Sequence, residues 1–154
     1  MSSAPGGEEE IRRLLAAYQQ YQAQADGLMQ QLNLTQLTAE GLERALVAVE
    51  ALDTAQVGQE ILVPIGSGSF IHGSLASKEK VVLNVGAGVS IEKTAAEAKE
   101  ILKVRKAEVL EGSKKLSEVL GKIDQEMQKI QAIMQQFEES AGQHQHGPGS
   151  EGVV

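Results

Sequence analysis

The feature that most constrains this chain is a seven-residue repeat of apolar side chains, which runs through two long segments of its 154 residues. In the first segment, residues 8–55, the repeat continues for six heptads. Its two series are Ile11, Tyr18, Ala25, Leu32, Ala39 and Leu46, and Leu14, Tyr21, Leu28, Thr35, Leu42 and Val49. Only Thr35 is neither apolar nor amphipathic, and a repeat of this length is typical of a coiled coil rather than of a short surface helix.

The second segment, residues 91–139, carries the repeat less regularly. Its main series is Ala95, Leu102, Val109, Leu116, Ile123, Ile130 and Phe137. The companion positions are interrupted by polar residues, and Leu120, Met127 and Met134 indicate a drift toward the neighbouring stripe. A straight helix drifts in this way against a strict seven-residue repeat. We expect Ser90 to cap this helix, because serine is a preferred residue just before the first helical turn.

The segment between the two expected helices, residues 56–90, has the composition of β-strands. Four strands are expected, at residues 60–65, 69–75, 80–85 and 89–91. Glycine-rich turns at residues 66–68 and 86–88 join them in pairs, which predicts two β-hairpins. Pro64 cannot donate a hydrogen bond to a strand ladder, so the first strand is expected to lie at an edge or to bulge there.

The two helical segments have nearly the same length, roughly 70 Å each at 1.5 Å per residue. Equal arms joined by a compact insert are expected to fold back on each other, which places Tyr18 near Lys129 and Ile130. The sequence therefore predicts an α+β fold: a long antiparallel two-helix coiled coil with two central β-hairpins. We expect the ends, residues 1–7 and 140–154, to be disordered, because they are rich in small and polar residues.

The composition excludes several classes of function. The chain has no cysteine and therefore no disulfide or thiolate metal site. Its net charge of −7 argues against nucleic acid as a partner, because phosphate binding needs clustered Lys and Arg. No apolar run approaches the roughly 18 to 20 residues of a membrane span. We therefore expect a soluble, cytoplasmic protein that binds neither nucleic acid nor membrane.

A search for catalytic chemistry finds no candidate constellation. No residues combine a nucleophile, a base and an oxyanion donor, and the glycine-rich turns lack the spacing of a phosphate-binding loop. His144 and His146 have no third ligand near them in the sequence, and His72 stands alone in a strand. We expect no enzymatic activity, no cofactor and no metal site.

The apolar side chains of the expected hairpins need partners, because two-stranded sheets are marginally stable in water and expose unpaired edges. We infer that the hairpins join strands of other subunits in an oligomeric β-barrel platform. The residues assigned to this assembly surface are Ile61, Val63, Ile65, Phe70, Ile71, Leu75, Val81, Leu83 and Val85.

At the other end of the expected coiled coil, the apolar seam continues almost to the ends of both helical segments. One interpretation is an ordinary seam. The other is that the last turns splay and bind a client, because Leu15, Met127 and Met134 give the seam surplus apolar width. The residues assigned to this client surface are Ile11, Leu14, Leu15, Tyr18, Ile130, Ile133, Met134 and Phe137.

The order helix, two hairpins, helix closely resembles the alpha-type subunits of the prefoldin family, in particular the archaeal ones. The specific part of the resemblance is residues 61–71 (ILVPIGSGSFI) and 85–93 (VGAGVSIEK), and the whole resemblance covers residues 8–139. It implies a hexamer of two alpha and four beta subunits, in which the hairpins form a double β-barrel and six coiled coils extend from it. It also implies that the coiled-coil tips hold unfolded proteins without ATP and deliver them to a group II chaperonin.

Two functional hypotheses follow. The first is an ATP-independent holdase whose tips bind exposed apolar segments of non-native chains, with several weak contacts acting together. The alternative is a structural coiled-coil tether or scaffold subunit that binds one folded partner. Both share the helical features, and they differ in whether several unrelated denatured proteins are bound.

Overall fold

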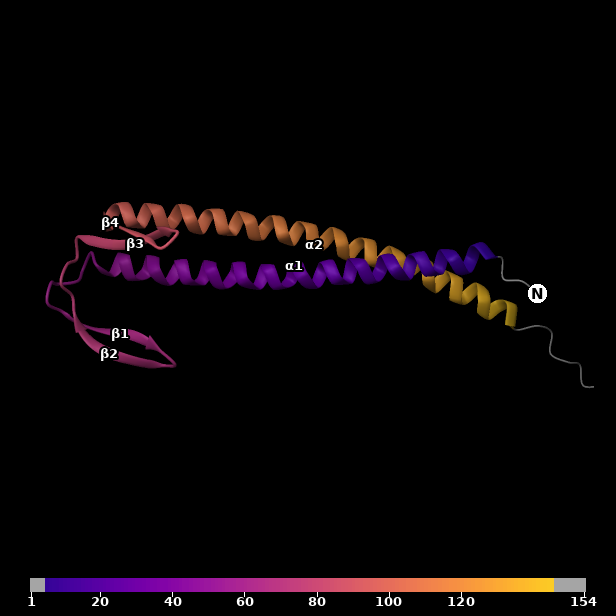
Figure 1. Cartoon of the computed structure of the whole chain (residues 1–154), viewed down its shortest axis with the longest axis horizontal. Helices are drawn as coiled ribbons and strands as arrows, with labels where there is room; N and C mark the ends of the chain where they lie inside the picture. Colours follow the sequence, from indigo (N-terminus) through magenta and orange to yellow (C-terminus); the bar gives the residue numbers. More distant parts are fainter. Residues whose placement is uncertain (1–4, 146–154) are drawn as a thin grey trace, which may run out of the picture. The chain divides into compact units, whose positions relative to one another are not determined.

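The computed structural model describes residues 5–145 and has two long helices separated by four strands (Figure 1). The elements in chain order are α1 (Pro5–Ala51), β1 (Glu60–Gly66), β2 (Ser69–Ser74), β3 (Lys80–Gly86), β4 (Val89–Thr94) and α2 (Ala95–Gln145). This order confirms the predicted fold class of two long helices with two antiparallel hairpins between them.

The helices extend further at the chain ends than the sequence predicts. Helix α1 begins at Pro5, which suits a first helical position because proline has no N–H to leave unpaired. Helix α2 continues to Gln145. Residues 5–7 and 140–145, expected to be disordered, are therefore helical, and the rest of those two segments lies outside the described residues.

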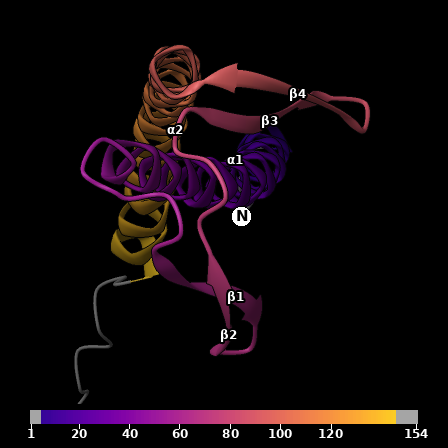
Figure 2. The ribbon, with the colours of Figure 1, turned by 90° about the vertical axis from the view of Figure 1, so that its left-hand side faces the viewer.

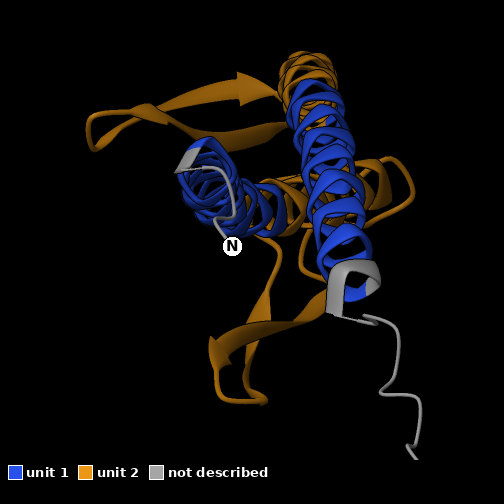
Figure 3. Cartoon of the chain, turned by 90° about the vertical axis from the view of Figure 1, so that its right-hand side faces the viewer, with its two compact units in different colours: residues 1–33, 114–154 blue, residues 34–113 orange. Residues whose placement is uncertain are grey.

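The chain divides into two compact units, shown in different colours in Figure 3. Unit 1 consists of residues 1–33 and 114–154, and thus of the first part of α1 and the last part of α2. Unit 2 consists of residues 34–113, which include the remaining helical segments and both hairpins.

Within each unit, burial along α1 follows the predicted heptad. From Leu14 to Val49, the residues of the two series are buried or half-buried, while most of the residues between them are exposed. The apolar seam therefore determines which face of the helix is covered, as expected of a coiled coil.

In α2 the covered stripe narrows from unit 2 to unit 1. In unit 2 the residues three and four positions after the main series are both buried or half-buried, and they are Ala98 and Lys99, Arg105 and Lys106, and Gly112 and Ser113. In unit 1 the residues four positions after it, Leu120, Met127 and Met134, are half-buried. Three positions after it, Val119 and Ile133 are exposed and Glu126 is half-buried. The stripe four positions after the main series is thus covered in both units, and it becomes apolar in unit 1.

Polar contacts to α2 occur in both units. In unit 2, Lys106 Nζ lies 2.5 Å from Glu43 Oε2 of α1, and Lys99 Nζ lies 2.5 Å from Oδ2 of Asp53 in the turn that follows α1. In unit 1, Gln131 Nε2 donates to the Tyr18 hydroxyl oxygen at 2.8 Å. Gln131 directly follows the Ile130 that the sequence placed near Tyr18, so the antiparallel pairing agrees with its expected register.

Two hairpins lie in unit 2 (Figure 2), and their turns have the same backbone conformation. In each, a two-residue turn has positive φ at both positions: 50° and 72° at Ser67 and Gly68, and 52° and 75° at Ala87 and Gly88. Such turns match the twist of antiparallel strands. The register shifts between Pro64 and Gly66 in β1–β2 and between Asn84 and Gly86 in β3–β4. The irregularity predicted at Pro64 is therefore present, but it belongs to the turn that both hairpins share and does not depend on proline.

Strand β4 is longer than expected, and the predicted cap of α2 is wrong. Ser90 pairs with Asn84, and Ile91 pairs with Leu83, so both belong to the β3–β4 ladder. The helix begins four residues later, where the Glu97 N–H donates to Thr94 Oγ1 at 3.2 Å. Thr94 is the N-cap because the ladder uses the backbone up to that residue.

The core of unit 2 joins the helices to the β3–β4 hairpin. Leu83 is 7% exposed and packs with apolar side chains of both helices. The buried members of this cluster are Leu46, Val49, Leu83, Ala98 and Leu102. The β3–β4 hairpin is therefore held by its own chain.

Replacing Leu83 with Ala should destabilise the fold by about 2 to 5 kcal/mol, because it leaves a cavity among the helices. Urea unfolding followed by circular dichroism measures this loss. Val82→Ala is the matched control, since Val82 is 64% exposed in the same strand and its truncation should change little. Equal effects of the two substitutions would contradict the packing described for Leu83.

Replacing Gly112 with Ala should stabilise α2 by about 0.5 to 1 kcal/mol, because alanine is the better helix former. An added Cβ at Gly112 meets nothing within 4 Å. The same unfolding measurement tests it. Gly66→Ala is the opposing control, because φ of +105° at Gly66 disfavours any side chain and the substitution should destabilise.

Candidate functional site

The β1–β2 hairpin carries an exposed apolar surface. Its large side chains Leu62, Ile65 and Phe70 are each more than half exposed. Of the nine residues assigned to assembly, Val63, Ile65, Phe70, Ile71 and Val85 are exposed, and Ile61, Leu75 and Val81 are half-buried. An exposed apolar sheet of this kind is typical of a surface that a partner covers.

Leu83 is the assigned assembly residue for which the structure gives a different position. Its side chain is buried among the helices of its own chain and offers no surface to a partner. The reason is that its hairpin packs on unit 2, whereas the equivalent Val63 of the other hairpin is exposed. Leu83 thus holds one hairpin in place.

Both hairpins have unpaired edges. Among residues 5–145 the strands form two separate two-stranded sheets, β1 with β2 and β3 with β4. Each strand therefore has one edge whose backbone groups lack a strand partner. Edges of this kind pair readily with strands of another chain.

The eight residues assigned to client binding all belong to unit 1, and we call them the helix-end surface. Ile11, Leu15 and Ile133 are exposed. Ile130 is 7% exposed and belongs to the seam. The half-buried members are Leu14, Tyr18, Met134 and Phe137. The helix-end surface thus combines exposed apolar side chains with the seam that supports them.

A depression lies within this surface, and it is lined by Leu15, Tyr18, Gln131, Met134, Gln135 and Glu138. The hydrogen bond between Gln131 and the Tyr18 hydroxyl crosses it from α2 to α1. This bond satisfies the polar end of the tyrosine and leaves its ring among apolar neighbours. The depression can therefore accept apolar side chains.

Another depression of unit 1, which the sequence pattern did not predict, is lined by Ala25, Met29, Ser117, Leu120, Gly121, Asp124 and Met127. Met29 is exposed beside the seam of α1, and no residue of this depression was assigned to client binding. A signal was present, because Met29, Met127 and Met134 all lie next to seam positions.

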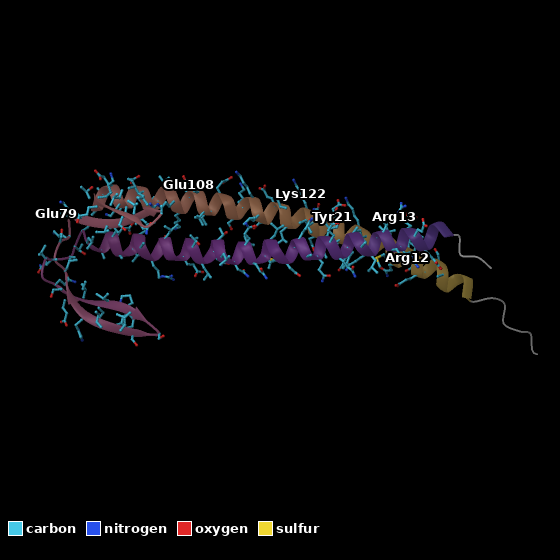
Figure 4. All side chains as sticks on the ribbon, viewed as in Figure 1. Arg12, Arg13, Tyr21, Glu79, Glu108 and Lys122 are labelled. Atoms are coloured by element: carbon cyan, nitrogen blue, oxygen red, sulfur yellow. The ribbon has the colours of Figure 1, made fainter. Side chains whose placement is uncertain are left out.

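Most charged side chains are exposed, and the half-buried Lys99 and Lys106 pair with Asp53 and Glu43. Glu108 and Lys122 project outward from α2, as Figure 4 shows. The hairpins carry two exposed contacts, with His72 Nδ1 2.7 Å from Glu60 Oε1 and Lys80 Nζ 3.9 Å from Glu92 Oε2. Exposed pairs contribute little to stability.

Residues 5–145 contain neither a candidate metal site nor a candidate membrane span. No three His, Cys, Asp or Glu side chains gather there in a way that could hold a metal ion. None of the helices in that range is both long and apolar enough to cross a membrane. His146 lies outside the described residues.

The sequence model of one protein family, described as "Prefoldin subunit", matches residues 8–139. A curated prefoldin subunit alpha of Methanothrix thermoacetophila is 53% identical over 118 residues, which are 76% of this chain and 77% of that protein. The prefoldin subunit alpha of Methanosarcina barkeri is 36% identical over 135 residues, which are 86% of this chain and 94% of that protein.

A solved structure has a similar fold. It is a cryo-EM structure of filamentous prefoldin from Methanocaldococcus jannaschii, with a TM-score of 0.65 and 25% sequence identity. The match covers 76% of this chain and 97% of that one. The similarity therefore extends over nearly all of the solved chain.

Replacing Phe70 and Ile71 together with Asp should prevent assembly with other prefoldin subunits, because both side chains are exposed and a partner would have to bury the new charges. Light scattering after size-exclusion chromatography measures the mass of the mixture. Ser74→Asp adds charge at the exposed end of the same strand and should leave the mass unchanged. A full-mass complex with the double variant would contradict this role of the hairpin.

Proposed function

Because the chain belongs to the prefoldin family of chaperone subunits, we propose that it is an ATP-independent holdase subunit that binds unfolded proteins through the helix-end surface of unit 1. The observation that carries the proposal is the exposure of Ile11, Leu15 and Ile133 at the free ends of the two helices. Burial of water-exposed apolar side chains against apolar segments of another chain lowers the free energy of the system, which favours binding.

The small size of the helix-end surface requires several copies to act together. A few apolar contacts bind a segment of a non-native chain weakly, and linked copies raise the effective concentration of each further contact. We propose that the exposed hairpin residues supply this linkage by joining beta subunits in a complex of two alpha and four beta subunits. The unpaired strand edges of both hairpins support this assembly.

Release of the client completes the proposed function. Holding by apolar contact alone needs no nucleotide, and weak individual contacts allow a client to transfer to another apolar binding site. We propose that a group II chaperonin is this recipient, which would place the chain in the cytoplasm. The basis of this step is membership of the family.

Replacing Ile11, Leu15 and Ile133 with Ser should abolish suppression of client aggregation while leaving the assembly intact. The three side chains are exposed, so their loss removes client contact and little seam packing. Light scattering of a heat-denatured client, with the assembled complex present, measures the effect. Val104→Ser on α2 is the control, because Val104 is also exposed but lies outside the helix-end surface. Unchanged suppression by the triple variant would overturn the proposal.

A second candidate is a structural tether that binds one folded partner, and the burial of Ile130 favours it. A seam that stays closed presents a fixed surface, which suits one partner of defined shape. Pull-down of several unrelated proteins in native and denatured form separates the two candidates. Binding of the denatured forms alone supports the holdase, whereas binding of one native protein supports the tether.

A further inference from the structure

Two of the depressions of unit 1, the one at Tyr18 and the one at Met29, are lined by residues from one side of α1 and one side of α2. On α1, Leu15, Tyr18, Ala25 and Met29 follow one another at intervals of three, seven and four residues, which keeps them on one side of a helix. On α2, the lining residues recur with the same period between Ser117 and Glu138. We call the two depressions together the methionine groove. From Leu15 to Met29 it extends about 21 Å at 1.5 Å per residue.

The groove is named for its lining, because all three methionines after Met1 belong to it. The chain has four methionines, and Met29, Met127 and Met134 line the two depressions. Methionine is unbranched and polarizable, so its side chain adapts to apolar partners of different shape. Met127 and Met134 lie on this side because they belong to the half-buried stripe four positions after the main series of α2.

The charge of the groove is one-sided. Asp124 and Glu138 are the charged residues of its lining, which includes no Lys or Arg. Asp124 accepts a hydrogen bond from Gln128 at 3.2 Å, and within residues 5–145 neither carboxylate forms an ion pair. The basic residues Arg12 and Arg13 project from the start of α1 (Figure 4) and are not part of the lining. The groove therefore favours a ligand that carries positive charge beside its apolar side chains.

The walls of the groove also limit the backbone conformation of a ligand. The backbone groups of α1 and α2 are used within those helices, and the polar atoms of Tyr18 and Gln131 bond to each other. An extended peptide in the groove would leave part of its backbone unpaired, which is costly. A helical peptide satisfies its own backbone and presents apolar side chains along one face.

We propose that the methionine groove binds basic amphipathic helical segments of about 14 residues in non-native clients. The inference rests on the proposed holdase function and names the class of segment that unit 1 prefers. Such a segment lays its apolar face on the methionines and places Lys or Arg beside Asp124 and Glu138. The preference extends the binding surface inward along α1 from the helix-end surface as far as Met29.

Fluorescence anisotropy of labelled peptides, measured with the assembled complex of this chain and beta-type subunits, tests the proposal. The first peptide has leucines on one helical face and flanking lysines, the second has glutamates in place of the lysines, and the third has two central prolines. We expect the lysine peptide to bind about tenfold more tightly than the glutamate peptide at low salt, with the difference shrinking at high salt. The proline peptide should bind weakly because it cannot form the helix.

Two variants of this chain assign the binding to the groove. Met29→Gln should weaken binding of the lysine peptide several-fold, whereas Val119→Gln should not, although the two side chains are 45% and 46% exposed. Asp124→Asn combined with Glu138→Gln should reduce the preference for lysine over glutamate. Each peptide carries a photo-crosslinker, so that crosslinks on α1 and α2 of this chain distinguish its groove from the beta subunits.

Equal binding of the lysine and glutamate peptides would overturn the inference while leaving the holdase function in place. Tight binding of the proline peptide would overturn its helical part, and equal effects of Met29→Gln and Val119→Gln would exclude the groove. Loss of binding by every peptide, together with failure to suppress client aggregation, would instead remove the proposed function itself.

Discussion

The apolar seam between α1 and α2 is the interaction on which the rest of the structure depends. The chain contains only four aromatic residues, and the buried residues of the two helices are aliphatic. Small and medium aliphatic side chains, repeated every seven residues, cover one face of each helix in both units. Because the seam needs only two positions in each heptad, apolar side chains at other positions remain exposed to water or to a partner.

Much of the remaining apolar surface lies in two places, on the hairpins of unit 2 and beside the seam of unit 1. In unit 2, one hairpin is fixed to the helices through Leu83, while the other keeps Phe70 and Ile71 exposed. In unit 1, the half-buried stripe four positions after the main series of α2 carries Met127 and Met134 beside the seam. Packing of one hairpin on the helices therefore supplies a fixed support in unit 2, and methionines beside the seam supply an adaptable surface in unit 1.

Much of this structure could be predicted from the sequence, because its signals are periodic or tied to particular turns. The heptad of α1 gave the covered face, and the glycine turns gave the hairpins. The start of α2 could not be predicted locally, since Ser90 and Thr94 are both suitable caps and the pairing of Ile91 with Leu83 decides between them. The burial of Leu83 likewise depends on which of two similar hairpins packs against the helices, and that choice is tertiary.

The sequence predicts which residues belong to the candidate site, but it does not predict which of them are buried or which line a depression. The eight residues of the helix-end surface all belong to unit 1, yet Ile130 supports the surface from within the seam. Met29 was missed because it lies one position outside the strict series, where a sequence pattern does not distinguish a surface residue from a groove residue. Only the packing of α2 beside it gives Met29 its place.

The central claim is that unit 1 binds the client while the hairpins hold the assembly. Hydrogen–deuterium exchange on the assembled complex, with and without an unfolded client, tests this claim most directly. The account predicts that the client slows exchange in residues 8–33 and 114–139 of this chain and leaves the hairpins, residues 60–94, unchanged. Slower exchange confined to the hairpins, with none in unit 1, would contradict it.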